Sequence, residues 1–340
     1  MIFKATKQTS DKRNPLALIG LLIFSYSHPA FAKKKIKIDG YVASEFEAES
    51  FKNGESNHLG KFSLETKRKN GVKSEFGVRF RTKDNDVLIR EALVNKKFDD
   101  GWKLEFGYAK KRFGLEYETG KLNRSTVDRS PLYRRSEVFT YAGRETMLRY
   151  YKKKDQKTLS PGYSIALGHS DSQNGSIVGS WRKPLSQDWS FNYWLQLQSD
   201  HIDDGQQIVA AAMHSFERKR DDDLFQWELL MGIDPEESEL RKLVGDNEKV
   251  KFAGMKFHYE QRFAADEESW WQWLGQSTMM VHDVDLPDFN SLQLLAGLNY
   301  GFEPVRMGLN LEVIGSTNRL DTKDRNFSES NAKFELIYEF

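Results

Sequence analysis

The last nine residues, Ala332 to Phe340, alternate polar with apolar side chains and end on an aromatic ring. Successive side chains of a β-strand point to opposite faces, so this period of two places Phe334, Leu336, Tyr338 and Phe340 on one face. A soluble domain rarely ends on its most apolar strand. The pattern therefore predicts a final amphipathic strand whose apolar face meets a nonpolar environment.

The first 32 residues predict a secretory signal peptide. Four basic residues lie between Lys4 and Arg13, a short apolar run follows from Pro15 to Ser25, and Ala30-Phe31-Ala32 offers small residues at both positions that a signal peptidase reads. A membrane-spanning helix needs about 20 apolar residues, which this run lacks. We expect cleavage after Ala32 and a mature domain over 33–340.

Composition agrees with a membrane protein whose strands meet lipid on one face and water on the other. The chain has no cysteine, 13% aromatic and 30% charged residues, and without residues 1–32 it carries 47 basic against 49 acidic residues. This balance gives no reason to expect a nucleic-acid partner. A mean hydropathy of −0.67 is compatible with a membrane if only one face of each strand meets lipid.

Period-two segments recur along the whole chain and predict about sixteen strands of roughly 10 residues, the length that spans a bilayer. Short turns and long gaps alternate between them. Asn70-Gly71, Asp99-Asp100-Gly101, Pro184–Asp188 and Glu303-Pro304 are short, whereas 112–144, 234–249 and 316–329 are long. Two gaps, 154–162 and 217–223, are long for the short-turn side. The segment 87–98 fits neither of the two possible strand registers, because each of them turns either Arg90 or Glu91 towards lipid.

These features together predict an all-β, antiparallel, closed barrel in the outer membrane of a Gram-negative bacterium. Closure is required because an open sheet in hydrocarbon leaves unpaired backbone groups at two edges. The alternative is a soluble β-sandwich, which would not combine a signal peptide, a terminal aromatic residue and unequal loops. Tyr338 and Phe340 are the candidate signal for the barrel-assembly machinery.

The gap 112–144, the third on the side expected to be extracellular, is the longest; it is rich in basic residues and has a net charge of +3. If it folds into the lumen, it forms a constriction that favours anions, because a guanidinium is always charged and matches carboxylate or phosphate oxygens. If it stays outside, its arginines pair with acids or with lipopolysaccharide. The constriction candidates are Arg112, Lys121, Arg124, Arg129, Arg134, Arg135 and Arg144. Basic residues at inward strand positions would extend the field: Lys73, Arg79, Arg81, Lys103 and Arg149.

One stretch resembles a known family. Residues 89–98, IREALVNKKF, followed by 102–114, WKLEFGYAKKRFG, are similar to the phosphate-selective porin O/P family. In that family a Glu-Ala strand precedes a glycine-containing strand that ends in a basic residue and Pro-Phe-Gly; here Arg112 replaces the proline. The resemblance implies a 16-stranded trimeric channel and leaves the solute open.

Other functions are weaker readings. His169, Ser170 and Asp171 adjoin in sequence, but neighbours on a strand face opposite ways and make no triad. The acidic residues within 283–288 could brace a loop around calcium, or could simply be solvated. A structural or enzymatic barrel without transport is the alternative function. The favoured reading is a non-enzymatic porin for passive diffusion of small hydrophilic solutes, with a modest preference for anions such as phosphate and no cofactor or metal.

Overall fold

The computed structural model describes residues 35–49, 53–67, 71–82, 86–169, 175–202, 205–235, 238, 248–266, 268–285, 290–316 and 329–340. The predicted signal peptide, 1–32, lies outside the described residues. Among the helices of the described part, none is long and apolar enough to cross a membrane.

The described residues form sixteen strands, as the sequence predicted. They are β1 (Lys35–Glu49), β2 (Asn53–Lys67), β3 (Val72–Arg81), β4 (Asp86–Lys97), β5 (Lys103–Lys110), β6 (Arg144–Lys152), β7 (Gly162–His169), β8 (Gly175–Pro184), β9 (Trp189–Ile202), β10 (Gly205–Lys219), β11 (Asp223–Ile233), β12 (Lys251–Ala264), β13 (Ser269–Val281), β14 (Asn290–Phe302), β15 (Val305–Ser316) and β16 (Glu329–Glu339).

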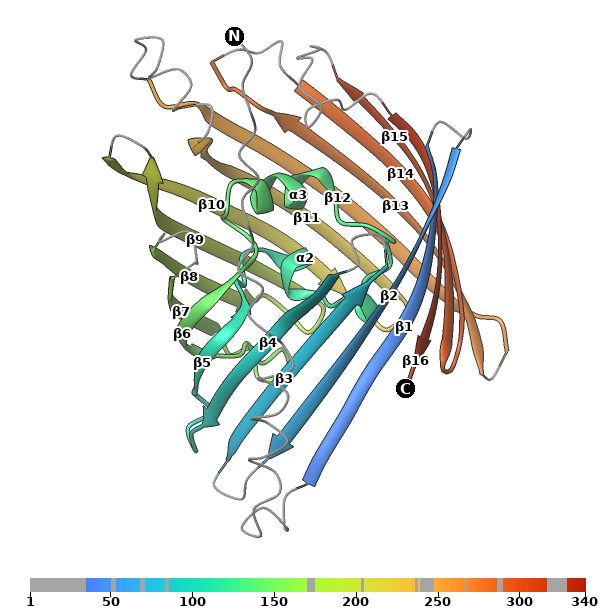
Figure 1. Cartoon of the computed structure of the whole chain (residues 1–340), viewed down its shortest axis with the longest axis horizontal. Coiled ribbons are helices and arrows are strands. Elements are labelled where there is room, and N and C mark those ends of the chain that lie inside the picture. Colours follow the sequence, from blue (N-terminus) through green and yellow to red (C-terminus); the bar gives the residue numbers. More distant parts are fainter. Residues whose placement is uncertain are drawn as a thin grey trace.

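The strands form one closed antiparallel barrel, in which each strand pairs with the next along the chain (Figure 1). The last strand closes the ring by pairing with β1, from Tyr41 opposite Glu339 to Glu49 opposite Asn331. Phe340 completes this seam through two backbone hydrogen bonds with Gly40, each 3.1 Å long. Closure satisfies the backbone groups that an open sheet would leave unpaired.

The outer face carries the apolar side chains that the period of two predicted. Ile165, Leu294 and Val313 are each more than half exposed to the surroundings of the barrel. On the same strands, the alternate side chains turn inward, so Gln293 and Glu312 are buried in the lumen. Because apolar-out and polar-in alternation is the pattern of a membrane barrel, these faces confirm the predicted fold class.

The connections differ between the two rims. At the rim that joins β2 to β3, β4 to β5, β8 to β9 and β14 to β15, the turns are short, and we call it the short-turn rim. The prediction of a long gap at 217–223 was wrong, because β10 continues to Lys219 and β11 begins at Asp223. The turn after β6 is long, as predicted, and Asp155 and Ser160 close it with two backbone hydrogen bonds.

An irregularity in β4 resolves the ambiguity of segment 87–98. Gly77 of β3 lies opposite Glu91, whereas the next residue, Val78, lies opposite Ile89. The register therefore shifts by one residue, and Arg90 is the extra residue of a β-bulge. Arg90 and Glu91 both line the lumen as a result.

Candidate functional site

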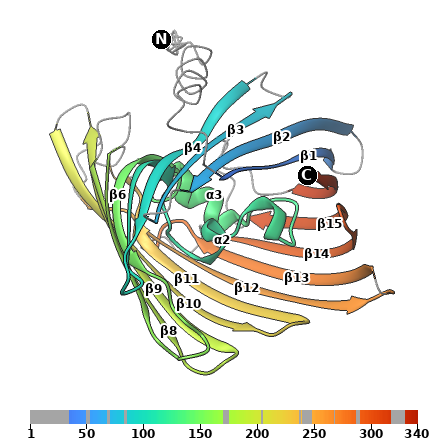
Figure 2. The ribbon, with the colours of Figure 1, turned by 90° about the horizontal axis from the view of Figure 1, so that it is seen from below.

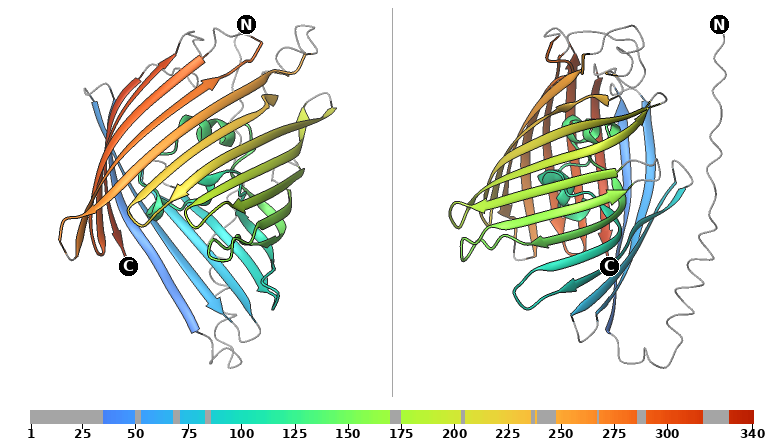
Figure 3. Two further views of the ribbon diagram at one scale, coloured as in Figure 1. Left: turned by 180° about the vertical axis from the view of Figure 1, so that it is seen from behind. Right: turned by 90° about the vertical axis from the view of Figure 1, so that its left-hand side faces the viewer.

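The connection between β5 and β6, residues 111–143, folds into the barrel, and we call it the inner loop. It contains α2 (Leu115–Glu118), the short 3-10 helix η2 (Lys121–Asn123) and α3 (Pro131–Val138). Figure 2 shows α2 and α3 enclosed by the strands, and the two views of Figure 3 agree. Pro131 suits the first position of α3 because its fixed φ is already helical and its missing N–H has no partner there.

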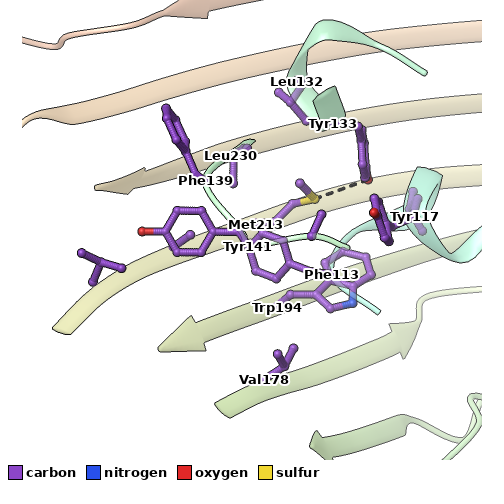
Figure 4. Packing of buried hydrophobic residues seen from close by; sticks show 14 of the residues in the cluster. Phe113, Tyr117, Leu132, Tyr133, Phe139, Tyr141, Val178, Trp194, Met213 and Leu230 are labelled. Atoms are coloured by element: carbon purple, nitrogen blue, oxygen red, sulfur yellow. Dashed lines mark hydrogen bonds between the residues drawn. The ribbon is translucent and has the colours of Figure 1, made fainter. Parts of the chain in front are cut away.

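An apolar core holds the inner loop against one side of the wall. Phe113, Leu132 and Tyr141 from the loop are almost fully buried against residues of β9 to β13 (Figure 4). On the wall this core includes Trp194, Met213, Leu230, Phe252 and Met280. The Tyr141 hydroxyl donates to the backbone oxygens of Ala210 and Ile233, at 3.1 and 2.7 Å, so the apolar contact is also fixed in register.

Beside this core lies a buried ionic network. The Lys256 ammonium of β12 contacts Glu228 at 2.5 Å and Glu116 of α2 at 3.2 Å, and all three side chains are nearly inaccessible. Tyr133 donates to Glu228 at 2.5 Å and accepts from the backbone N–H of Glu116 at 3.0 Å. Ser130 donates to Glu116 from its hydroxyl and from its backbone. Because each buried charge has partners of opposite sign, this network fixes α2 on the wall.

Ion pairs fasten the far end of the inner loop. Lys121 contacts Glu45 of β1 and Glu335 of β16. Arg306 of β15 donates to the backbone oxygens of Lys121, Leu122 and Arg124, at distances between 2.8 and 3.3 Å. The inner loop thus crosses the whole lumen and is fastened at both sides.

Two water-accessible cavities remain beside the inner loop. The first has a volume of about 730 Å³ and is lined by residues of β1 to β5 and of the loop. The second, of about 700 Å³, extends along β2 to β8 towards the short-turn rim. Six lining residues belong to both cavities, so the two meet at a neck: Lys61, Glu75, Glu91, Lys110, Tyr117 and Gly120.

Both cavities are strongly basic. The first is lined by 11 basic and seven acidic residues. The second is lined by 10 basic and four acidic residues. Because the whole chain has a net charge of only +1, the positive charge is concentrated where a solute would pass.

Several of these cations are not neutralised by a carboxylate. Among the described residues, Glu91 takes both Lys61, at 3.1 Å, and Arg144, at 3.3 Å. Arg79, Arg90 and Arg129 have no ion pair there, and Nε of Arg79 and Nη1 of Arg129 are buried without a hydrogen-bond partner. The guanidinium of Arg129 instead lies 4.2 Å from the centre of the Tyr117 ring. These guanidinium groups can donate hydrogen bonds to oxyanions from solution.

The structure brings most of the predicted basic residues to these cavities. Six of the seven constriction candidates line one or the other: Arg112, Lys121, Arg124, Arg129, Arg134 and Arg144. Arg135 does not; it is buried, contacts Asp234 at 3.2 Å and covers Phe139. All five inward candidates on strands line a cavity: Arg79 and Arg81 the first, Lys73, Lys103 and Arg149 the second.

Sequence reasoning missed other lining cations. Lys61 and Arg182 occupy inward positions of β2 and β8, and the same period of two could have identified them. Lys110 lines the neck at the point where β5 ends and the chain turns into the lumen. The inward position of Arg90 could not be predicted, because it depends on the β-bulge in β4, and local alternation does not show where a bulge lies.

The field of these cations affects the acids of the inner loop. Burial by itself would raise the pKa of Glu116, but Lys256, Arg124 and Arg129 outweigh it and hold the pKa below its usual range. Burial by itself would also raise the pKa of Asp128, but Lys333 and Arg134 outweigh this effect and hold that pKa well below its usual range. Both carboxylates therefore stay charged in mildly acidic solution.

The described residues show no assembled metal or catalytic centre. No group of three or more potential metal ligands occurs among them. Asp283 and Asp285 are described, but 286–289, like Ser170 and Asp171, lie outside the described residues. Ser125 Oγ lies 3.2 Å from Nε2 of His258, yet Glu260 contacts that same nitrogen at 3.1 Å. A relay needs the carboxylate on the other ring nitrogen, so these three side chains are not arranged as a triad.

Comparison with known proteins agrees with this geometry. Residues 53–181 match the model of the phosphate-selective porin O and P family, which confirms the resemblance seen in residues 89–114. No curated protein matches the chain significantly.

Several solved structures share the fold at low sequence identity. The trimer form of OmpT, an outer membrane protein of Vibrio cholerae, has a TM-score of 0.64 and 12% identity, covering 90% of this chain and 99% of that one. An anion-selective porin from Comamonas acidovorans has a TM-score of 0.62 and 9% identity, covering 91% and 100%. The channel DcaP of Acinetobacter baumannii has a TM-score of 0.59 and 11% identity, covering 91% and 98%.

Proposed function

We propose that this chain, whose residues 53–181 carry the phosphate-selective porin O and P pattern, is an outer-membrane porin that passes small hydrophilic anions. One observation supports the anion preference above all. The two cavities that meet at the neck are lined by 19 different basic residues and nine acidic ones. A positive field along the path raises the local concentration of anions and lowers that of cations.

The route runs between the inner loop and the wall formed by β1 to β8. At the neck a solute passes Lys110 and Tyr117 on one side, and Lys61, Glu75 and Glu91 on the other. The unpaired guanidinium groups offer successive weak contacts rather than one tight site, which suits passage because a bound anion must also leave. Diffusion of this kind needs no catalysis, cofactor or metal.

The proposal includes the cellular setting. A signal peptide cleaved after Ala32 would send the chain to the outer membrane, where Tyr338 and Phe340 would engage the assembly machinery. The short-turn rim would face the periplasm, and the opposite rim would meet lipopolysaccharide. A homotrimer is proposed from the trimer form of the Vibrio cholerae protein and from the closed symmetry common among such barrels.

Reversal potential in a planar bilayer under a tenfold KCl gradient tests the proposed selectivity. The test variant changes Arg79, Arg90 and Arg129 to Gln, which removes three of the lining cations that form no ion pair among the described residues. The control changes Lys219, Arg220 and Lys251 to Gln, which removes the same charge from outside both cavities. Heat-modifiable mobility on a gel confirms that each variant has folded.

We expect the wild type to prefer chloride, and the control to match it. A unit charge 5 Å from an ion in water is worth about 0.8 kcal/mol, or roughly fourfold in relative permeability, before screening by salt. The test variant should therefore move several-fold towards equal permeability. A cation-selective wild type, or a test variant with unchanged selectivity, would overturn the anion route. Absence of conductance would favour a structural or enzymatic barrel.

A further inference from the structure

The short-turn rim has an uneven distribution of charge. Over the ends and turns of β4 to β9, residues 96–103, 152–157 and 182–188, the sequence has nine basic and four acidic residues. Over the turns that follow β10 and β12, residues 218–223 and 262–268, it has four basic and six acidic residues. Because the strands are ordered around the barrel as they are in the chain, these are two adjoining arcs of one rim.

Six of the eight lysines in these segments define what we call the lysine arc: Lys96, Lys97, Lys152, Lys153, Lys157 and Lys183. Lys97, Lys153, Lys157 and Lys183 are exposed. Among the described residues, none of these four has an ion pair with a carboxylate. In the neighbouring arc, by contrast, Arg218 contacts Asp223 at 2.8 Å and Arg220 contacts Asp188 of the β8–β9 turn at 3.0 Å. These four lysines therefore keep their positive charge available to a partner.

The outward members of the arc lie just beyond a group of aromatic rings. Lys183 follows Trp181 by two residues, so this lysine shares the outer face of β8 with an aromatic side chain. Trp102, from the turn after β4, stacks on Tyr150 at 4.5 Å between ring centres and lies 6.5 Å from Tyr163. Tryptophan and tyrosine of membrane proteins concentrate at the level of the lipid headgroups.

We propose that the lysine arc binds the phosphate groups of anionic phospholipids in the adjoining leaflet. The proposal rests on the membrane setting of the proposed function. The aromatic rings place the arc at headgroup depth, and the ammonium groups supply the charge complementary to a lipid phosphate. A lysine near a membrane surface contributes about 1 kcal/mol towards anionic lipid, which is roughly fivefold in affinity.

The structure favours lipid over a soluble polyanion as the partner. A soluble anion in the second cavity would meet Lys152 and Lys153, which line it, but not Lys96, Lys157 or Lys183, which line neither cavity. These last three residues lie on the outer face or in an exposed turn. Only a partner outside the barrel can use them together.

Lipid retention measured by native mass spectrometry tests the site. The purified protein is released from nanodiscs made of equal parts of phosphatidylcholine and phosphatidylglycerol, and the bound lipids are counted. The test variant changes Lys96, Lys157 and Lys183 to Gln; the control changes Lys219, Arg220 and Arg262 to Gln on the neighbouring arc. Conductance of each variant is recorded in parallel, since none of these residues lines a cavity.

We expect the wild type and the control to retain phosphatidylglycerol in preference to phosphatidylcholine, and the test variant to lose that preference by fivefold or more. Equal retention by the test variant and the wild type, or equal loss in both variants, would overturn the site. Displacement of the retained lipid by soluble tripolyphosphate, with no lipid preference, would assign the arc to a soluble anion instead. If the wild type binds lipid but conducts nothing, the lipid site stands and the porin function fails.

Discussion

The two halves of the barrel wall are alike outside and different inside. On the outer face, β1 to β8 and β9 to β16 present the same apolar alternation, with Ile38 and Leu294 each 54% exposed. On the inner face, the first half presents charged side chains to open cavities, whereas much of the second half presents amides, aromatic rings and methionines to the inner loop. The apolar alternation of the outer face therefore follows from contact with the membrane, and the composition of the inner face depends on whether water or the inner loop lies against it.

This difference follows from what each inner face contacts. Gln198 donates to the backbone oxygen of Phe139 at 3.0 Å, and Asn299 donates to that of Ser125 at 2.8 Å, so neutral amides on the covered half satisfy the loop backbone. Charged groups would be costly there unless paired, as Lys256 is. On the open half, water solvates the charges and no such restriction applies.

Breaking the ionic anchor of the covered half should have the largest effect. Lys256→Ala leaves Glu116 and Glu228 buried without their ion-pair partner, and loss of one member of a buried ion pair costs about 3–5 kcal/mol. We expect a clearly lower melting temperature by tryptophan fluorescence and a noisier single-channel current, because α2 is released from the wall.

Lys251→Ala is the matched control, since Lys251 is an exposed residue at the start of the same strand. It should leave both readouts at the wild-type level. A quiet and equally stable Lys256→Ala channel would show that the apolar core alone holds the inner loop.

Acid should loosen the covered half only at low pH. A carboxyl whose pKa is lower in the folded than in the unfolded state stabilises the fold above the unfolded value, near 4.3 for Glu, and this stabilisation is lost as the pH falls through the folded pKa. Because the pKa of Glu116 is lowered, the melting temperature should stay level between pH 7 and about 4.5 as far as this group decides it, and fall below about 4. Glu116→Gln should flatten that acid limb. A decline that begins near pH 6 would contradict this assignment.

A carboxylate added to the open half should have the smallest effect. Ser63 lines the first cavity on β2, two residues from Lys61. Ser63→Glu should lower the chloride preference by less than about fourfold, because neighbouring cations partly neutralise the new charge. Gln187→Glu, in an exposed turn outside both cavities, makes the same charge change and should leave the reversal potential unaltered. Equal shifts in both variants would mean that overall charge, rather than the open half, sets selectivity.

The sequence predicted the barrel well because each strand carries its own signal. Alternation such as Leu292, Leu294, Ala296 and Leu298 needs no long-range information to identify an outward face. The basic residues of 112–144 were predicted either to form a constriction or to stay outside the lumen, and six of the seven line the cavities.

The remaining features depend on contacts between distant residues. Lys256 meets Glu116 across 140 positions, and nothing local distinguishes it from any other inward lysine. Arg135 belongs to the same charged run as Arg134, but one helical step turns it from the lumen to Asp234. Arg90 reaches the lumen only because β3 and β4 pair out of step, which local alternation cannot show.

The apolar core inside the barrel has a consequence for altering the channel. Trp194, Met213 and Leu230 are fully covered only while the inner loop lies against them. Excising residues 111–143 would not yield a wider pore of the same kind, because it would expose an apolar surface along one side of a water-filled lumen. The inner loop therefore both narrows the lumen and shields apolar wall residues from the water inside it. The width of the channel can be altered without exposing this apolar surface only by changing residues on the charged side of the lumen.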